Sequence, residues 1–184
     1  YSTSKGINGL RKAQAVYYKR RFDVNLDPED EVIVTLGSKE GLANLAQAIT
    51  SPGDIILSPN PSYPIHPYGF IIAGASLRHL PAMDEGIFKP DLYLERLERS
   101  IIESVPAPVA VIVSFPSNPT AQVVSLEFYE EVVKIARKYN VYILSDLAYA
   151  EIYYDNSPPP SILQIPKAKE VAVEFTSMSK TYAM

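Results

Sequence analysis

The sequence predicts an α/β fold with a mainly parallel central sheet and helices on both faces. Strand-like apolar runs alternate with segments of helical spacing along the 184 residues, which is typical of parallel strands joined by helices. An apolar content of 47% is enough for a sizeable core in one domain. Polar residues follow several of the strand-like runs, and small molecules bind at that edge of open α/β sheets.

The first part of the chain is expected to hold two helices and one strand. A helix is predicted over residues 8–21, because its apolar side chains share one face: Leu10, Ala13, Val16 and Tyr17. The apolar run 32–36 is predicted as a strand. A second helix is predicted over residues 38–49, so the α/β alternation begins here.

The middle part repeats the same unit. Short apolar runs predict strands over residues 54–58 and 76–80, with a loop leading into a helix over 61–73 between them. A helix is predicted over residues 91–103, where four apolar side chains are available for burial: Leu92, Leu94, Leu97 and Ile101.

The last part contains the strongest predicted strand, the continuous apolar run 109–114. Ser125 can cap a helix that reaches Tyr139. The remaining expected elements are a strand over 141–144, a proline-rich surface loop over 155–166, and a buried strand over 170–175 in which Val171, Val173 and Phe175 alternate.

Composition and charge exclude several classes of function. The net charge is −4, and 17 basic residues are scattered among 21 acidic ones, so no basic stripe fits a nucleic acid. Zero cysteines exclude disulfides and thiolate metal sites, and His66 and His79 lack partners at metal-ligand spacing. No apolar run reaches the length of a membrane span. We therefore expect a cytoplasmic protein without a metal centre, a nucleic-acid partner or a membrane association.

Lys180 is the most informative single residue. It follows the last predicted strand within Ser177-Met-Ser179-Lys180, where a lysine amine can form an imine with an aldehyde cofactor and hydroxyl groups can hold a phosphate. A surface lysine after an edge strand is the alternative interpretation. The other candidates also follow predicted strands: Ser38, Lys39, Tyr63, Asn118, Asp146 and Tyr149. Taken singly, several also have a structural interpretation, since Ser38, Lys39 and Asn118 fit turns, Asp146 fits a helix cap, and Tyr63 is one of 13 tyrosines.

The candidate residues belong to short motifs in a characteristic order. These are Tyr1 before Gly6-Ile-x-x-Leu10, Gly37-Ser-Lys39, Asn60-Pro-x-Tyr63, Ser117-Asn-Pro-Thr120, Asp146-x-x-Tyr149 and Ser177-x-Ser-Lys180. In this order they resemble the large domain of the fold type I, class I/II aminotransferases, which depend on pyridoxal 5'-phosphate. The resemblance covers nearly the whole chain, and the stretch from Phe115 to Lys180 looks closest to the alanine and LL-diaminopimelate aminotransferase branch.

The resemblance implies a role for each candidate. Lys180 would hold pyridoxal phosphate as an internal aldimine and then shuttle a proton. Asp146 would pair with the pyridine nitrogen, and Tyr149 and Asn118 would donate hydrogen bonds to the phenolate oxygen, which makes Lys180, Asp146 and Tyr149 the expected catalytic residues. The remaining cofactor contacts would be Tyr63 stacking on the ring, backbone N–H groups of Ser38 and Lys39, hydroxyls of Ser177 and Ser179, and Tyr1 from the neighbouring subunit.

The resemblance also implies a homodimer and a longer protein. We expect residues 1–184 to be one truncated cofactor-binding large domain, because the chain starts at Tyr1 without methionine and stops at Met184. The family's phosphate-binding arginine and small domain would follow, so this piece alone is expected to be inactive. Ala121 stands where the family usually has glycine, and Tyr1 also fits the frayed end of a chain.

The expected activity is transfer of an amino group between an amino acid, with an alanine-like donor, and a 2-oxo acid. Two alternatives share most of these residues. One is another fold type I enzyme, such as a decarboxylase, lyase or synthase, and the other is an aminotransferase-like sensor domain of a transcription regulator. These residues do not distinguish alanine from diaminopimelate as the donor.

Overall fold

The structure is a computed structural model that describes residues 3–184. The chain divides into two compact units, of which the first ends at Leu36 and the second spans Gly37–Met184. Each unit is described by itself below. Tyr1, which the family resemblance assigns to a neighbouring subunit's cofactor phosphate, lies outside the described residues.

The first unit is built on α1 (Asn8–Phe22), which confirms the helix predicted over residues 8–21. Three aromatic side chains pack together in its last turns, Tyr17, Tyr18 and Phe22, with ring centroids between 5.2 and 6.0 Å apart. Asp23 ends the helix in the left-handed conformation, with φ of 57°. The aromatic cluster therefore anchors the helix where the chain turns away.

The prediction of a strand over residues 32–36 is wrong. These residues form no strand, and Val34 N–H donates a 3.0 Å hydrogen bond to the Lys5 carbonyl. Ile33 is 66% exposed and Leu36 is 90% exposed. An extended apolar run becomes a strand only when a neighbouring strand supplies a ladder of backbone bonds, and none does so within residues 3–36.

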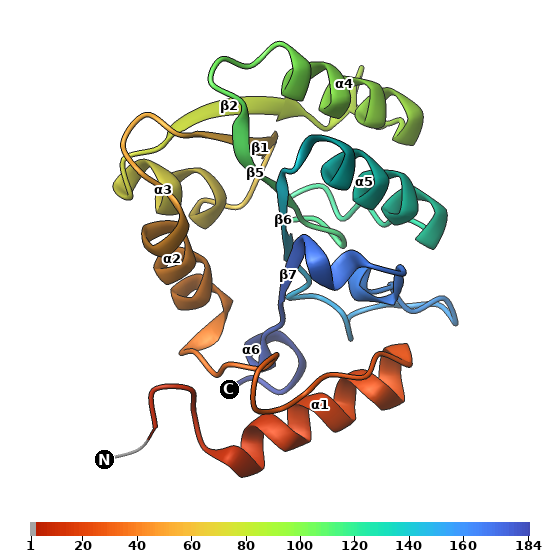
Figure 1. Ribbon diagram of the computed structural model, residues 1–184. Coiled ribbons are helices and arrows are strands. Elements are labelled where there is room, and N and C mark those ends of the chain that lie inside the picture. The colour runs from red at the N-terminus through yellow and green to blue at the C-terminus, as the bar shows by residue number, and fades with distance from the viewer. Residues whose placement is uncertain (1–2) are drawn as a thin grey trace. The chain divides into compact units, whose positions relative to one another are not determined.

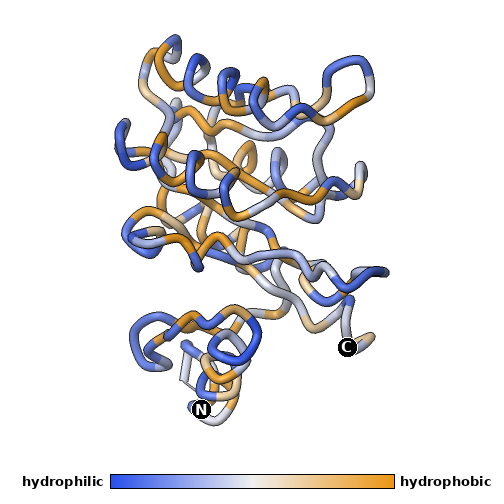
Figure 2. The backbone as a smooth tube through the Cα atoms, turned by 90° about the vertical axis from the view of Figure 1, so that its right-hand side faces the viewer, coloured by the Kyte–Doolittle hydropathy of each residue, from blue (hydrophilic) through white to orange (hydrophobic). Residues whose placement is uncertain are grey.

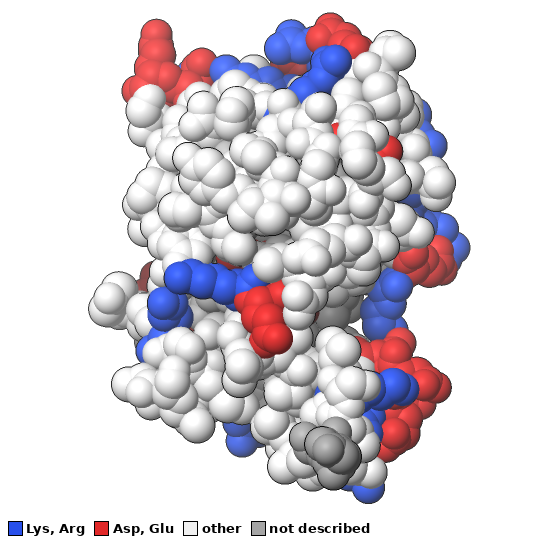
Figure 3. Space-filling model, turned by 90° about the vertical axis from the view of Figure 1, so that its left-hand side faces the viewer, with Lys and Arg blue, Asp and Glu red and all other residues white. Residues whose placement is uncertain are grey.

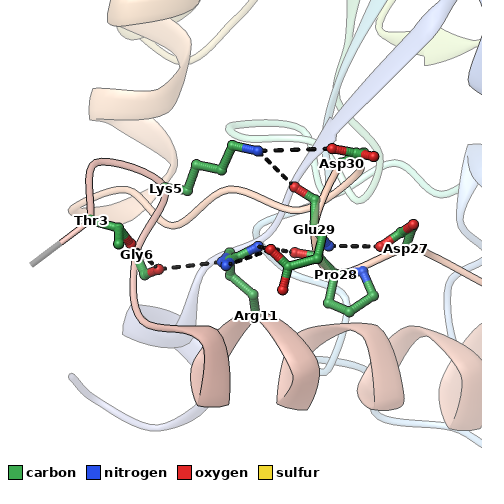
Figure 4. A network of polar contacts seen from close by, with 8 residues as sticks. All are labelled: Thr3, Lys5, Gly6, Arg11, Asp27, Pro28, Glu29 and Asp30. Atoms are coloured by element: carbon green, nitrogen blue, oxygen red, sulfur yellow. Dashed lines mark hydrogen bonds and ion pairs between the residues drawn. The ribbon is translucent and has the colours of Figure 1, made fainter.

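A buried arginine organises the loops of the first unit (Figure 4). Arg11 is 5% exposed and points from α1 towards the turn at residues 27–30. Its guanidinium donates to the carbonyls of Gly6 and Pro28, and both of its terminal nitrogens lie 3.1 Å from Glu29 Oε2. A side chain at Gly6 would collide with Val34, and Gly6 has φ of +89°, so glycine is required at this close approach.

The second unit contains a five-stranded parallel sheet with the order β2-β1-β5-β6-β7 (Figure 1). All five strands match predicted strands in place, with ends that differ by up to two residues. The bounds are β1 Ile55–Asn60, β2 Ser76–Pro81, β5 Pro108–Val113, β6 Tyr142–Asp146 and β7 Ala172–Phe175. The parallel order confirms the predicted α/β class.

Helices cover both faces of this sheet, as predicted. On one face, α4 (Pro90–Ile102) and α5 (Leu126–Tyr139) pack on strand residues such as Leu57, Val111 and Ile143. On the other face, α2 (Gly37–Ile49) and α3 (Ile65–Ile72) pack on Ile56, Ile112 and Leu144. Figure 2 shows the apolar positions gathered along the inner strands of this unit, with hydrophilic positions on the outer turns of its helices. No helix within residues 3–184 combines the length and apolar character needed to cross a membrane.

The second unit differs from the prediction in two places. A hairpin that local patterns do not reveal, β3 (Met83–Asp84) and β4 (Ile87–Phe88), turns through Glu85 and Gly86, which both have positive φ. The strand predicted as buried over residues 170–175 is β7, an edge strand preceded by the short 3₁₀ helices η1 (Ile162–Gln164) and η2 (Ala168–Glu170). Val173 is 45% exposed, because an edge strand has a neighbour on one side only.

Candidate functional site

The candidate site lies at the carboxyl edge of the second unit's sheet. β1, β5, β6 and β7 are parallel and adjacent, so the loops that follow them meet at one edge. Tyr63 follows β1, Asn118 follows β5, Asp146 ends β6, and Lys180 lies shortly after β7. The sheet therefore gathers side chains that are more than 100 residues apart in the sequence.

A buried hydrogen bond between two polar side chains forms the centre of this edge. Asp146 is 5% exposed, and its Oδ2 lies 2.8 Å from Nε2 of His66, a fully buried residue of α3. With a carboxylate as acceptor, Nε2 must carry the hydrogen. The other oxygen, Oδ1, accepts a 3.3 Å bond from Ala148 N–H, so both oxygens of Asp146 are held by the protein.

The sequence pattern does not reveal His66 as a site residue. Local spacing shows an isolated histidine without metal partners, and its contact with Asp146 spans 80 residues of sequence. Its position along the chain could have indicated the contact. His66 comes shortly after β1, and Asp146 ends β6, so both lie at the carboxyl ends of parallel strands. His66 Nδ1 has no hydrogen-bond partner within residues 3–184, and neither does the buried hydroxyl of Ser58.

Asn118 and Tyr149 form a second pair at the same edge. Asn118 Nδ2 donates a 3.2 Å hydrogen bond to the Tyr149 hydroxyl, and both side chains are half-buried. The turn that carries Asn118 is fixed by Ser117, whose hydroxyl contacts the Thr120 hydroxyl and accepts a 3.0 Å bond from Gln122 N–H. The side chains of Asn118, which follows β5, and Tyr149, which follows β6, are thus held side by side.

Ala121 completes that turn in a conformation that favours glycine. Its φ is +54°, and its N–H donates a 2.9 Å bond to the Ser117 carbonyl. A left-handed φ costs a residue with a Cβ about 1–2 kcal/mol relative to a right-handed one. Glycine, which the family resemblance leads us to expect at this position, would avoid that cost, whereas Ala121 bears it.

Tyr63 connects the first turn of α2 to the buried pair. Its ring lies 5.4 Å from Lys39 Nζ and 6.1 Å from the His66 ring, which it meets at 77°. A hydrogen bond with the Tyr63 side chain raises the pKa of the exposed Lys39 above its ordinary value of 10.5. The structure thus brings Lys39, Tyr63, His66 and Asp146 into one series of contacts.

The residues after β7 are more exposed. Ser177 accepts a 3.2 Å bond from Ser179 N–H and so caps the four-residue helix α6 (Met178–Thr181). Ser179 and Lys180 are exposed, and Ser38 is half-buried at the start of α2. Within residues 3–184, no hydrogen bond joins Ser38, Ser177 or Lys180 to the buried pair.

A pocket opens beside Asn118 and His66. Its lining includes Tyr93 of α4, whose buried hydroxyl has no hydrogen-bond partner within the described chain. Burial raises the pKa of Tyr93 well above its ordinary value. Other residues that line the pocket are Pro61, Ser62, Phe88 and Ser117.

Comparison with known proteins shows which family the chain belongs to. The family model described as "Aminotransferase class I and II" matches residues 1–184. Putative aminotransferase AatC of Rhizobium meliloti (strain 1021) is 57% identical over 100% of this chain and 44% of its own length. Glutamate-pyruvate aminotransferase AlaC of Escherichia coli (strain K12) is 55% identical over 100% of this chain and 43% of its own length.

Two further relatives agree. LL-diaminopimelate aminotransferase of Aquifex aeolicus (strain VF5) is 49% identical over 100% of this chain and 46% of its own length. The apo structure of BacF from Bacillus subtilis is 34% identical, with a TM-score of 0.90 over 100% of this chain and 48% of BacF. The chain thus spans less than half the length of these relatives. Since the family model matches over the whole length, this chain belongs to the aminotransferase class I and II family of pyridoxal-phosphate-dependent enzymes.

Proposed function

We propose that the full-length protein is an aminotransferase that uses pyridoxal 5'-phosphate to move an amino group between an amino acid and a 2-oxo acid. The observation that carries the proposal is the buried Asp146–His66 contact at the carboxyl end of β6, within a chain that belongs to this family. A buried carboxylate held on both oxygens is suited to keep a proton on a ring nitrogen.

The chemistry of the side chains at this edge fits the cofactor. It offers one carboxylate at Asp146, two neutral donors at Asn118 and Tyr149, an aromatic ring at Tyr63 and an amine at Lys180. The start of α2 at Gly37 could bind the phosphate through its backbone N–H groups. Gly37 has φ of +81°, and the space where a Cβ atom would lie is open, with no other atom within 4 Å. The hydroxyls of Ser38, Ser177 and Ser179 add further donors.

Each residue then has a defined task. When bound, pyridoxal phosphate would supply an aldehyde for an amine and a ring that accepts electrons. Lys180 would bind the aldehyde and carry a proton to and from the α-carbon of the substrate. Asp146 would hold a proton at the ring nitrogen, and His66 would keep the Asp146 carboxylate in one orientation. Asn118 and Tyr149 would donate hydrogen bonds to the ring oxygen.

A homodimer is the second part of the proposal, and an uncharged face supports it. Residues 41–77 contain a single charged residue, Asp54. On the face over α2 and α3, Figure 3 shows a broad uncharged surface. α3 exposes Tyr68, Ile71 and Ile72 there, with Ile72 79% exposed. An apolar face of this kind is suited to a second copy of the chain.

The dimer can be tested on the full-length protein by light scattering across a range of concentrations. We expect Ile72→Glu to shift the population towards monomers, whereas Ile102→Glu on α4, which alters another exposed isoleucine, should leave the dimer intact. An unchanged dimer in the Ile72 variant would contradict this placement of the interface.

Alanine or glutamate is the proposed amino donor, with pyruvate or another 2-oxo acid as acceptor, since the relative AlaC is a glutamate-pyruvate aminotransferase. The proposed location is the cytoplasm, and cell fractionation would test it. The decisive experiment mixes the full-length, cofactor-loaded protein with L-alanine without any 2-oxo acid. Loss of the visible absorbance band together with stoichiometric pyruvate would establish half a transamination. A band that survives alanine, glutamate and diaminopimelate would refute these three donors. A band that also survives the other amino acids would refute the aminotransferase proposal in favour of a lyase or a sensor domain.

A further inference from the structure

A second polar cluster lies across the sheet from Asp146. Its centre is Glu174 of β7, whose carboxylate oxygens accept hydrogen bonds from two hydroxyl groups and a backbone N–H. Oε2 accepts from the Ser145 hydroxyl at 2.9 Å and from Ile162 N–H at 3.2 Å, and Oε1 accepts from the Ser161 hydroxyl at 2.5 Å. Ser145 is 1% exposed and Ser161 is fully buried, so this is an interior cluster and not a surface contact.

The cluster sits on the α5 face of the sheet. Side chains alternate along a strand, so Ser145 points to the same face as Ile143, whereas Asp146 points to the α3 face, where it meets His66. Tyr129 of α5 is also buried beside it. Burial, and after it the nearby Glu174 carboxylate, raises the pKa of Tyr129 well above its ordinary value.

Glu174 joins three segments that each lead to a candidate site residue. Ser145 immediately precedes Asp146 and pairs directly with Glu174 across the parallel ladder. Ser161 and Ile162 end the long loop that begins after Asp146 and contains Tyr149. Glu174 itself lies three residues before Ser177 and six before Lys180. One carboxylate therefore fixes the start and the end of the loop and the strand that leads to the lysine.

Backbone hydrogen bonds also connect the segments after β6 and β7, beyond the Glu174 cluster. Leu147 N–H donates a 2.8 Å hydrogen bond to the Phe175 carbonyl, one residue beyond the last paired position of the ladder. Ser161 also opens η1 with a reciprocal cap, in which Gln164 Oε1 accepts from Ser161 N–H at 2.9 Å. The returning loop is thus rigid at the point where Glu174 holds it.

We propose that Glu174 is a positioning residue, which acts from the opposite face of the sheet to hold the Asp146–Tyr149 segment and the lysine-bearing segment after β7 in one relative geometry. This inference rests on the proposed function. Hydrogen bonds to a carboxylate are stronger than those between neutral groups, so the cluster is suited to resist movement of β7 against β6. Its loss would leave both candidate segments in place but misaligned.

The test uses Glu174→Gln in the full-length protein. Glutamine has the same shape, but its amide nitrogen cannot accept a bond, so one of the two acceptor oxygens and the charge are lost. Glu170→Gln is the matched control, because Glu170 lies four residues earlier and makes an exposed 3.2 Å ion pair with Arg137. Ser161→Ala is the second variant, in case Glu174→Gln fails to fold. It keeps the carboxylate but removes the Ser161 hydroxyl, which donates to Glu174 and accepts from Leu163 N–H.

The first readout needs no cofactor. We expect amide hydrogen exchange over residues 147–163 to become about tenfold faster in Glu174→Gln, which is the change expected from losing one charge-assisted hydrogen bond. Ser161→Ala should show the same direction, and Glu170→Gln should match the wild type. Unchanged exchange in a folded Glu174→Gln protein would overturn the proposal.

The second readout separates positioning from a purely structural role. With the cofactor loaded, we expect the pH midpoint of the visible band to move upward in Glu174→Gln, since poorly aligned Asn118 and Tyr149 donors stabilise the ring oxygen less. We also expect kcat to fall more than KM changes. Faster exchange with an unchanged midpoint and unchanged kcat would show a structural role only and would refute positioning. A wild-type protein that forms no band would refute the proposed function itself. A normal band in the wild type that is unchanged in the variants would refute only the positioning role of Glu174.

Discussion

The candidate site has two parts that differ in how the protein holds them. The inner group, Asp146, His66, Asn118 and Tyr149, is buried or half-buried and its members are joined in pairs by side-chain hydrogen bonds. The outer group, Lys39, Ser179 and Lys180, is exposed. Substitutions in the inner group should therefore alter both stability and chemistry, whereas those in the outer group should alter chemistry alone.

The largest effect is expected at Lys180, in the outer group. Lys180→Ala should abolish the visible band of the cofactor-loaded full-length protein and lower turnover by several orders of magnitude. Because Lys180 is exposed, the free energy of unfolding should stay within about 0.5 kcal/mol of the wild type. Absorbance spectra and thermal unfolding check both parts. Lys169→Ala, at another exposed lysine, should behave as the wild type, and a retained band in Lys180→Ala would disprove the anchor role.

Asp146→Asn should show the contrasting behaviour of the inner group. The band should still form, but removal of the α-proton should slow by about 10²–10⁴-fold, because the proton at the ring nitrogen is no longer held by a charge. Loss of a hydrogen bond to a charged group should also cost about 1.5–3 kcal/mol of stability. Single-turnover kinetics and chemical denaturation measure the two effects. The exposed Asp155→Asn serves as control, and normal proton removal in Asp146→Asn would rule out the assigned role.

Ala121→Gly should stabilise the turn that carries Asn118. Glycine removes the cost of the left-handed φ of +54°, and the greater freedom of the unfolded chain offsets part of it, which leaves a gain of up to about 1 kcal/mol. Ala13→Gly in the middle of α1 is the matched control, since glycine in a helix interior costs about 1 kcal/mol. Urea unfolding of the two variants should therefore shift in opposite directions. A shared direction would mean that the turn is not strained.

The smallest effect is expected at Tyr63. Tyr63→Phe removes the hydroxyl that raises the pKa of Lys39, so that pKa should fall towards 10.5. A raised pKa means that protonated Lys39 favours the folded state, a contribution present below pH 10.5 and lost as the pH rises through the folded value. The pH dependence of Lys39 acylation, measured by mass spectrometry, checks the change. Tyr154→Phe, at a fully exposed tyrosine, should leave the acylation profile unaltered.

Local sequence patterns were sufficient to predict the secondary structure of segments whose conformation depends mainly on their own residues. Ser125 caps α5 by accepting a bond from Phe128 N–H, as its position before an amphipathic run predicts. The continuous apolar run 109–114 forms the predicted strand, β5, and most of its side chains are buried. The resemblance to a known family, carried by motifs such as Ser177-x-Ser-Lys180, identified the family before any geometry was known.

Local patterns failed where partners distant in sequence decide the outcome. Residues 32–36 have the composition of a strand but no neighbouring strand to pair with within residues 3–36. Val173 is exposed because β7 lies at an edge, which its own alternation cannot reveal. The contact between His66 and Asp146 depends on α3 and β6 meeting across 80 residues. Each of these features is set by tertiary pairing and not by a local preference.

The Arg11 network acts as a cross-link in a chain that has no cysteine. By holding Glu29 and the Pro28 carbonyl from α1, the guanidinium closes a loop of 18 residues, as a disulfide would, without a covalent bond. Unlike a disulfide, this contact is absent from the unfolded chain, so it stabilises the folded state directly and does not lower the conformational entropy of the unfolded one. Such a cross-link is indifferent to reducing agents, and it depends on the fork of donors that arginine has and lysine lacks.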